Sequence, residues 1–426
     1  MPSCTLPQRA SIASLPLELR VKILEMAIDD GRWEDMTTLE AVMLVNKACF
    51  AVAAPVFWRV LDLAAKGTAK LDRFFQLPLG VRQLVRYIRT GQGLADEPSS
   101  DERIHKLCDV VSEAPNLVGL DVALVGPYEH GAPGWALFER LRYNVWPKLQ
   151  VFELFFPSRL KACPISLPNR ALLSYLNPDH LQRLTLYGVA NLSPDDLERT
   201  LQCLLSFRRL THLRLVGSSV QDFPLVRLTP FPAPLRSFHL DFYNSTMSAE
   251  DISDFLSSVA VTLEYLSISV SVEGDLPAIH LPRLRSLLLS TNEPIEHLAS
   301  LCTAPLELVE IVPPDFEPPT RASLMKSLKA MRNTLEVLIS NEDIADHIQP
   351  KEVKPFVNWV HRRGVWYLDR TWEGFQPAWW DVSEALDDFS TPRRLGGEGL
   401  ARKDDLAWRV SSVDGIEAEE DENWED

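Results

Sequence analysis

The side chains that most often carry catalysis or bind metals are spread thinly along this chain. Its six cysteines are far apart, because the nearest pair, Cys163 and Cys203, is separated by 40 positions. This spacing excludes the close Cys-x-x-Cys pairs of structural zinc sites. The nine histidines have no acidic or cysteine partner at an informative spacing. We therefore expect neither a metal site nor a cofactor.

Motifs of nucleophilic, metal-assisted or phosphate chemistry are also missing from the sequence. It contains no GxSxG, HExxH, P-loop, GxGxxG or HRD-type segment. The glycine-rich cluster at Gly396–Gly399 follows no apolar strand, so it does not have the context of a phosphate cradle. We expect a protein that is not an enzyme and has no catalytic residues. An enzyme whose site is assembled from distant residues is the alternative.

Composition and charge narrow the class of protein further. The 426 residues are 46% hydrophobic, which excludes wholesale disorder. Acidic residues outnumber basic ones by 59 to 43, and eight of the acids lie between Val413 and Asp426. This balance argues against binding to nucleic acid, which needs a basic face. The first sixteen residues lack the apolar core of a secretion signal, and no stretch reaches about 18 apolar residues. We expect a cytoplasmic or nuclear location and no membrane contact.

A spacing of apolar residues, L-x-x-L-x-L with Phe, Val or Ile allowed in place of Leu, recurs through the middle of the chain. Successive copies start 21 to 32 residues apart, about 27 on average, which is close to the period of leucine-rich repeats. The copies are Leu117-Leu120-Val122, Leu149-Phe152-Leu154, Leu181-Leu184-Leu186, Leu210-Leu213-Leu215, Leu235-Phe238-Leu240, Leu263-Leu266-Ile268, Leu284-Leu287-Leu289, Leu306-Val309-Ile311 and the weaker Leu335-Leu338.

Each copy predicts a short strand whose alternate residues enter a shared core. Helix signals lie between the copies. Ser193 precedes Pro194 and two acids, Ser248 precedes Ala249 and two acids, and Thr320 precedes a further apolar stripe. We predict an α/β fold in which residues 115–345 form a leucine-rich-repeat solenoid, with a parallel sheet on its concave face and helices outside.

The residues between the core positions are expected to point to the concave face, which is where a solenoid usually binds a protein. For any one of them, solvated strand surface is the alternative. The predicted substrate-binding residues are Glu153, Phe155, Arg183, Tyr187, His212, Arg214, His239, Asp241 and Tyr265. Asp121 and Glu310 occupy equivalent positions in other copies.

Residues 14–63 have the pattern of a small module of three helices. The first helix opens at Leu15-Pro16, the second lies around 39–45, and the third runs from Lys47 to about Trp58. The segment closely resembles an F-box, in the form common in fungal F-box proteins with leucine-rich repeats. The matched elements are Leu15-Pro16-x-Glu18, Ile23-Leu24, Leu44-Val45-Asn46-Lys47, Phe50 and Phe57-Trp58.

The resemblance implies a mechanism without catalysis. An F-box docks on the Skp-type adaptor of a cullin–RING ubiquitin ligase, and the repeats hold an unknown protein substrate close to the conjugating enzyme. The residues that this resemblance assigns to the adaptor contact are Leu15, Pro16, Leu19, Ile23, Leu24, Val45 and Phe50. For several of them, Ile23 and Phe50 included, the alternative is that they hold the three helices together. The whole module would then serve only as an N-terminal cap of a repeat scaffold.

The remaining segments complete the expected organisation. Residues 1–13 are predicted to be a flexible N-terminus, and 64–114 an irregular linker or degenerate repeats. Residues 346–392 are rich in tryptophan, which favours a cap over the end of the array, with an aromatic ligand surface as the alternative. Residues 393–426 are predicted to be a disordered acidic tail.

Overall fold

The computed structural model of the chain has two compact units, whose described residues lie within Met1–Leu149 and within Gln150–Gln376, and each unit is described by itself. The structure describes Pro16, Leu19, Met43 and residues 47–62, 72, 74–89, 100–123, 145–155, 172–189, 192–218, 223–292, 294–301, 303–311, 321–331, 333–335, 337–340 and 366–369. The predicted N-terminus (1–13) and acidic tail (393–426) lie outside these residues.

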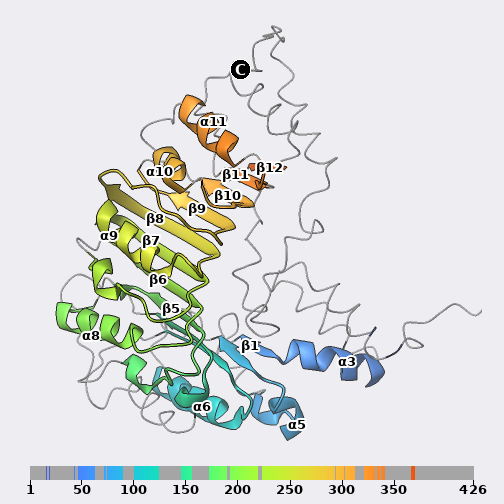
Figure 1. Cartoon of the computed structure of the whole chain (residues 1–426). Helices are drawn as coiled ribbons and strands as arrows, with labels where there is room; N and C mark the ends of the chain where they lie inside the picture. Colours follow the sequence, from blue (N-terminus) through green and yellow to red (C-terminus); the bar gives the residue numbers. More distant parts are fainter. Residues whose placement is uncertain are drawn as a thin grey trace, which may run out of the picture. The chain divides into compact units, whose positions relative to one another are not determined.

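The second unit is built on a parallel sheet whose strands follow one another in chain order, as Figure 1 shows. The α/β prediction is therefore confirmed. The strands are β4 (Val151–Phe155), β5 (Arg183–Tyr187), β6 (His212–Ser218), β7 (Ser237–Ser248), β8 (Tyr265–Glu273), β9 (Ser286–Ser290), β10 (Leu308–Ile311), β11 (Val337–Ser340) and β12 (Trp366–Asp369).

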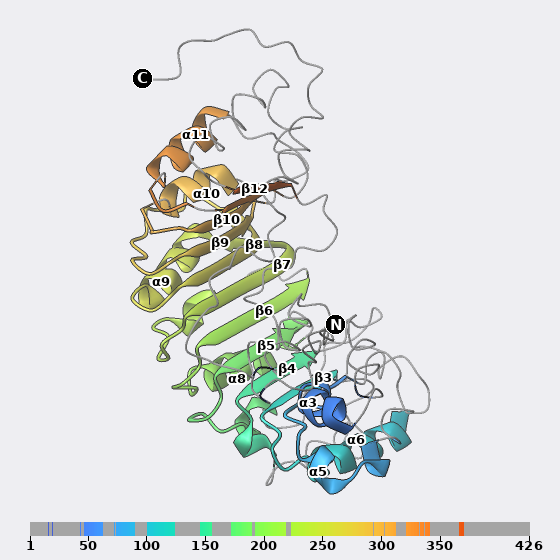
Figure 2. The same cartoon turned by 90° about the vertical axis from the view of Figure 1, so that its right-hand side faces the viewer.

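Helices and turns connect these strands. They are η5 (Leu172–Tyr175), α8 (Pro194–Leu204), η7 (Leu225–Leu228), α9 (Ala249–Val259), α10 (Pro294–Leu301) and α11 (Arg321–Ala330). Helices α8, α9 and α10 lie on one side of the sheet, and Figure 2 views the strands from the other side. A parallel pair of strands needs such a crossover, because the chain must return to the end of the sheet at which the first strand began before the next strand can start.

Local signals in the sequence explain where two of the helices begin. Helix α8 starts after Ser193, whose Oγ accepts a hydrogen bond from the backbone N–H of Asp196 at 3.2 Å. Helix α9 starts after Ser248, whose Oγ accepts from the N–H of Glu250 at 3.1 Å. Each serine satisfies one of the backbone donors that the first helical turn leaves free. Both N-caps were predicted from the sequence.

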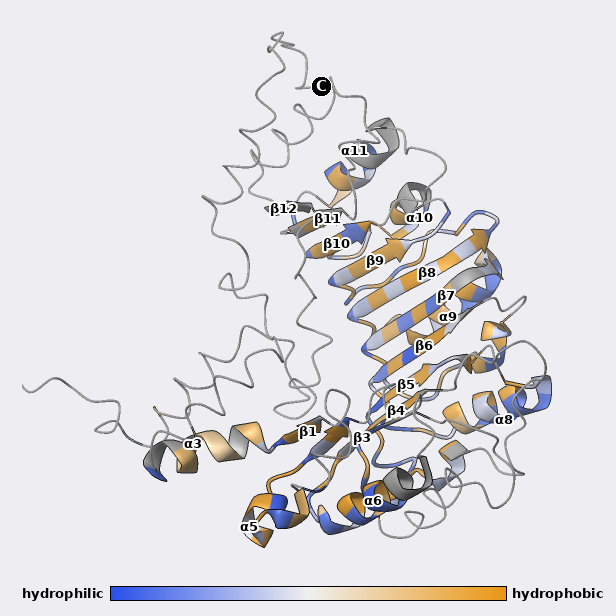
Figure 3. Ribbon diagram, turned by 180° about the vertical axis from the view of Figure 1, so that it is seen from behind, coloured by the Kyte–Doolittle hydropathy of each residue, from blue (hydrophilic) through white to orange (hydrophobic). Residues whose placement is uncertain are grey.

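The apolar positions of the repeat form the core. Phe152, Leu184, Leu213, Phe238, Leu266, Leu287, Val309 and Leu338 are the second positions of successive copies, and all are buried. The strand pairing places them opposite one another from β4 to β11. Figure 3 shows the result as apolar and polar residues that alternate along the strands. Alternation is expected where one face of each strand is buried under helices and the other is not.

A backbone contact also recurs from one repeat to the next. The carbonyl of Gln150, just before β4, accepts hydrogen bonds from the N–H groups of Gln182 and Arg183, at 2.8 and 2.9 Å. The carbonyls of Gln182, Thr211, Arg236, Glu264 and Arg285 each accept from two consecutive N–H groups of the following repeat in the same way. The repeated unit is therefore defined by this recurring pair of backbone hydrogen bonds as well as by the spacing of its leucines.

The first unit has the same kind of sheet. It contains α3 (Lys47–Phe57), β1 (Val60–Asp62), α5 (Leu79–Arg82), β2 (Tyr87–Arg89), α6 (Ser100–Glu113), β3 (Gly119–Ala123) and η4 (Trp146–Lys148). Strands β1, β2 and β3 pair in parallel. The carbonyls of Arg59 and Arg86 make the same double hydrogen bond.

Two of the predicted segments contain strands of this sheet. The segment 14–63, predicted to be a helical module, contains β1. The segment 64–114, predicted to be an irregular linker or degenerate repeats, contains β2, where Val85 and Ile88 are buried at positions that hold leucine in other copies. The predicted cap 346–392 includes β12, which pairs with β11. None of the helices in the described ranges is both long enough and apolar enough to cross a membrane.

Candidate functional site

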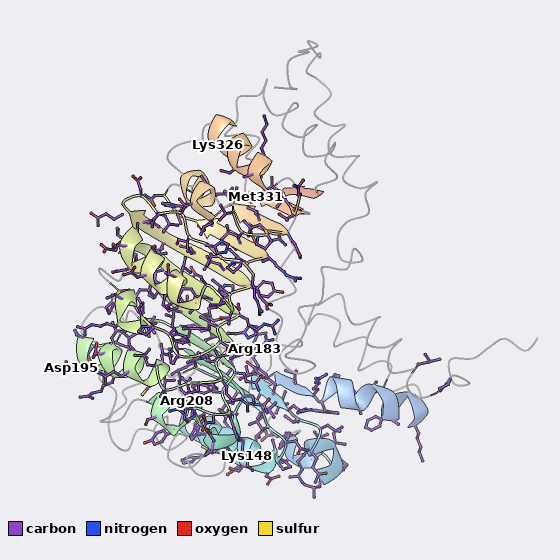
Figure 4. The ribbon with its side chains drawn as sticks, in the orientation of Figure 1. Lys148, Arg183, Asp195, Arg208, Lys326 and Met331 are labelled. Carbon is purple, nitrogen blue, oxygen red and sulfur yellow. The ribbon has the colours of Figure 1, made fainter. Side chains whose placement is uncertain are left out.

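Side chains that alternate with the core residues form the opposite face of the second unit's sheet. We call the part carried by β4 to β8 the polar face, because its strands bring charged and aromatic residues into three rows. The first row is Val151, Arg183, His212, Ser237 and Tyr265; the second is Glu153, Thr185, Arg214, His239 and Ser267; the third is Phe155, Tyr187, Val216, Asp241 and Ser269. Figure 4 labels Arg183 on β5 and Asp195 on α8, at opposite sides of the sheet.

The strand register therefore brings the predicted substrate-binding residues together on one surface. Glu153, Arg183, Tyr187, His212, Arg214, Asp241 and Tyr265 are all partly exposed there. His239 is only 5% exposed, so it differs from the expectation of a solvated position. The side chain of Phe155 lies outside the described residues, although its backbone pairs with that of Tyr187.

Arg214 is the centre of this surface. Its Nη1 donates to the hydroxyl of Tyr187 at 3.5 Å, and its guanidinium carbon lies 5.4 Å from the centre of the same ring. Its Nη2 lies 3.6 Å from Oδ2 of Asp241 on the next strand. An arginine held between an aromatic ring and a carboxylate presents a fixed guanidinium, and Arg and Tyr are the residue types that most often dominate protein interfaces.

Two histidines on neighbouring strands are held in the uncharged state. Burial first, and then the charges of Arg183 and Arg236, lower the pKa of His212 well below its usual value of 6.5, and a proton on His239 would lower it further. Burial first, and then the charge of Arg214, lower the pKa of His239 in the same direction. Each guanidinium disfavours a second positive charge nearby. Both imidazoles are therefore neutral at pH 7.

Thr211 contacts the ring of His212. Its Oγ1 lies 3.1 Å from the carbonyl oxygen of Gln182 and 2.9 Å from Nδ1 of His212. One hydroxyl therefore joins the backbone of the preceding repeat to this imidazole. Sequence reasoning missed Thr211, since it lies just before the strand at a position that the leucine spacing leaves unassigned.

The face does not extend unchanged into neighbouring repeats. Glu310 on β10 is 1% exposed, and all four residues of that strand are buried. Asp121 on β3, in the other unit, is also buried and lies 3.9 Å from Nε of Arg89. Both were expected to point to the concave face with the other residues between the core positions. Among the strands whose side chains the structure describes, β4 to β8 offer several partly exposed polar and aromatic side chains together.

In the N-terminal module, the structure describes three of the residues predicted to bind an adaptor. Pro16 is exposed, Leu19 is 49% exposed, and Phe50 on α3 is 43% exposed. By contrast, Ala53 and Ala54 on α3 are buried. Leu15, Ile23, Leu24 and Val45 lie outside the described residues. Leu19 and Phe50 are therefore large apolar side chains that their own chain leaves half uncovered.

Within the described ranges, no group of three or more His, Cys, Asp or Glu side chains is placed to hold a metal ion. The candidate surfaces contain aromatic, apolar and charged side chains of the kind that bind proteins. Neither a known protein family nor a curated protein was found to match the chain.

Proposed function

We propose that the chain is a substrate-recognition subunit of an SCF-type cullin–RING ubiquitin ligase, and that its repeats form a leucine-rich-repeat solenoid. The N-terminal helices would dock on a Skp-type adaptor, and the polar face would hold a protein substrate. The proposal includes no catalytic step by this chain, because tethering alone raises the effective concentration of substrate at the conjugating enzyme.

The observation that carries this proposal is the exposure of Leu19 and Phe50 in a segment that resembles an F-box. Large apolar residues left uncovered on a small helical module are expected to bury their surface against a partner. The polar face supports the second half of the proposal, because Tyr187, Arg214 and Tyr265 are residue types typical of interface hot spots.

The experiment is co-purification of the full chain with a Skp-type adaptor. We expect Leu19→Asp with Phe50→Asp to weaken adaptor binding at least about 30-fold, since apolar hot spots commonly contribute about 2 kcal/mol or more each. Both side chains are half exposed, so the thermal unfolding midpoint should change little. Leu79→Asp is the matched control, because Leu79 is 59% exposed but lies on α5, outside the F-box-like segment.

A repeat scaffold that only uses its N-terminal helices as a cap is the second candidate. Deletion of residues 1–63 would not separate the two, because it removes β1 and so breaks the pairing with β2. The point substitutions avoid this problem. Adaptor binding that survives in the double variant, or that is absent from the unmodified chain, would favour the scaffold and contradict the receptor.

A further inference from the structure

The two neutral histidines of the polar face are diagonal neighbours. His212 lies in the first row on β6 and His239 in the second row on β7. Arg183 on β5 is paired in register with His212, and Arg214 on β6 is paired with His239. Arg236, just before β7, also acts on His212 and is the third guanidinium around the pair. Each imidazole is thus set among positive charges.

Two carboxylates near the pair are engaged with arginines. Asp241, two residues beyond His239 on β7, lies 3.6 Å from Arg214 and so shares its charge with that guanidinium. Glu264, before β8, is taken up by two contacts with Arg236. Strand β8 presents Ser267 beside His239, and Glu153 lies two strands away from Arg214, on β4.

Burial of the rings also opposes protonation. A charged imidazole at His212 would lie beside Arg183, its partner in the strand register, with only part of its surface in contact with solvent. His239 is nearly inaccessible, so its charged form loses most of its hydration. Both residues therefore resist a proton in the folded chain and accept one more readily when the surrounding packing opens.

We propose that His212 and His239 are a proton-sensitive switch in the polar face, which loosens the packing of β6 and β7 when the surroundings become acidic. In the proposed receptor this makes retention of a substrate on the face dependent on pH, and that consequence rests on the proposed function. The switch itself does not, because it depends only on groups within the second unit.

The sign of the effect follows from where each state binds protons. Both pKa values are lowered in the folded chain, so below about pH 6.5 the unfolded chain takes up protons that the folded chain refuses. Stability supplied by the neutral pair is complete above about pH 6.5 and is lost as the pH falls toward the folded pKa values. Each histidine can raise the unfolding constant up to about tenfold per pH unit in that window, and the pair up to about 100-fold.

The test compares unfolding of the full chain, without any partner, from pH 7.5 to about pH 5.5. We expect the His212→Gln/His239→Gln variant to lose the steep fall in stability that the unmodified chain shows below about pH 6.5. His180→Gln/His280→Gln is the matched control, because both of those histidines are exposed, and it should keep the steep fall. An unchanged pH dependence in the first variant would overturn the proposal.

A second measurement needs no stable double variant. Histidine ring carbons of the folded, unmodified chain can be followed by NMR during acidification, with the two single Gln variants used to assign the signals. We expect the His212 and His239 signals to stay in the neutral form through pH 6.5, and titration at or above that pH would overturn the switch. No adaptor is present in either experiment, so failure here is distinct from failure of the receptor proposal.

Discussion

Two neighbouring connections in the second unit join successive parallel strands, but they have different structures. Between β7 and β8 the chain forms helix α9, whose Ile252, Phe255 and Val259 are buried. Between β8 and β9 it forms no helix, and residues 274–285 instead bury Leu276 and Ile279 from an irregular path. Both connections deliver the next strand to the same parallel register.

The difference lies in what holds each connection in place. Helix α9 is stabilised by its own N-cap, Ser248, and by its own apolar stripe. The irregular connection depends on the following repeat, because Oγ of Ser300 donates to the carbonyl of Leu276 and the N–H of Ile279 donates to the carbonyl of Ser300. Strand spacing is therefore constant in this sheet, while the connection can be a locally encoded helix or a segment that its neighbour supports.

The largest expected effect comes from truncating a buried side chain of α9. Phe255 of α9 is fully buried, and its ring lies 4.5 Å from that of Phe238 on β7 and 6.0 Å from that of Phe231. We expect Phe255→Ala to lower the free energy of unfolding by about 3–5 kcal/mol, because it leaves a cavity between helix and sheet. Denaturant unfolding measures this change.

Phe255→Leu is the control for that substitution. It keeps most of the apolar volume, so a loss of no more than about 1.5 kcal/mol is expected. A cost below about 1 kcal/mol for Phe255→Ala would show that α9 contributes little to the core. The contrast between a locally encoded and a supported connection would then be wrong.

How far the sequence could predict the fold depends on the same contrast. The leucine spacing was enough to place strands β3 to β11, because a residue in every second strand position must be apolar to enter the core. Helices α8 and α9 could be predicted from Ser193 and Ser248. The path of 274–285 could not, since the hydrogen bonds that support it at Leu276 and Ile279 come from Ser300 in a later repeat.

The candidate site was predictable to a similar degree. Alternation along the strands was enough to put Arg183, Arg214 and Asp241 on one face. It could not say that His239 would be buried or that Thr211 would orient His212, because both depend on which side chains the neighbouring strands supply. In the first unit, degenerate repeats within 64–114 were one of two expectations, but the position of β2 could not be given, since Val85 and Ile88 replace the leucines.

An intermediate effect is expected from the side chain of Asn292, which forms hydrogen bonds with the end of β8. Strand β9 ends at Ser290, whereas β8 continues to Glu273. The side chain of Asn292 takes the place of the missing strand: its Oδ1 accepts from the N–H of Val272 at 2.7 Å, and its Nδ2 donates to the carbonyl of Val272 at 3.1 Å. One amide side chain thus satisfies both backbone groups of one residue.

We expect Asn292→Ala to cost about 1–2 kcal/mol of unfolding free energy, because both groups of Val272 lose their partner in a partly buried place. Hydrogen exchange of the Val272 amide should accelerate more than that of core amides such as Leu266. Asn292→Asp separates the two bonds, since a carboxylate can still accept from the N–H but cannot donate to the carbonyl. If exchange at Val272 is unchanged in the alanine variant, the side chain does not hold this end of β8.

The smallest expected effect compares the ion pair that flanks the helical connection with the equivalent pair two repeats later. Arg236 and Glu264 flank the helical connection and make two contacts, Nε to Oε1 at 3.1 Å and Nη2 to Oε2 at 2.7 Å, with side chains 26% and 15% exposed. Arg285 and Glu307 occupy the equivalent positions two repeats later, with one contact of 3.6 Å and side chains 54% and 44% exposed.

Double-mutant cycles with alanine should give a coupling of about 0.5–1 kcal/mol for the Arg236–Glu264 pair. For the second pair we expect about 0–0.3 kcal/mol, because solvent screens a single long contact. Equal couplings would mean that bidentate geometry and partial burial add nothing at these positions, so that the helical connection owes its stability to α9 and its apolar contacts alone.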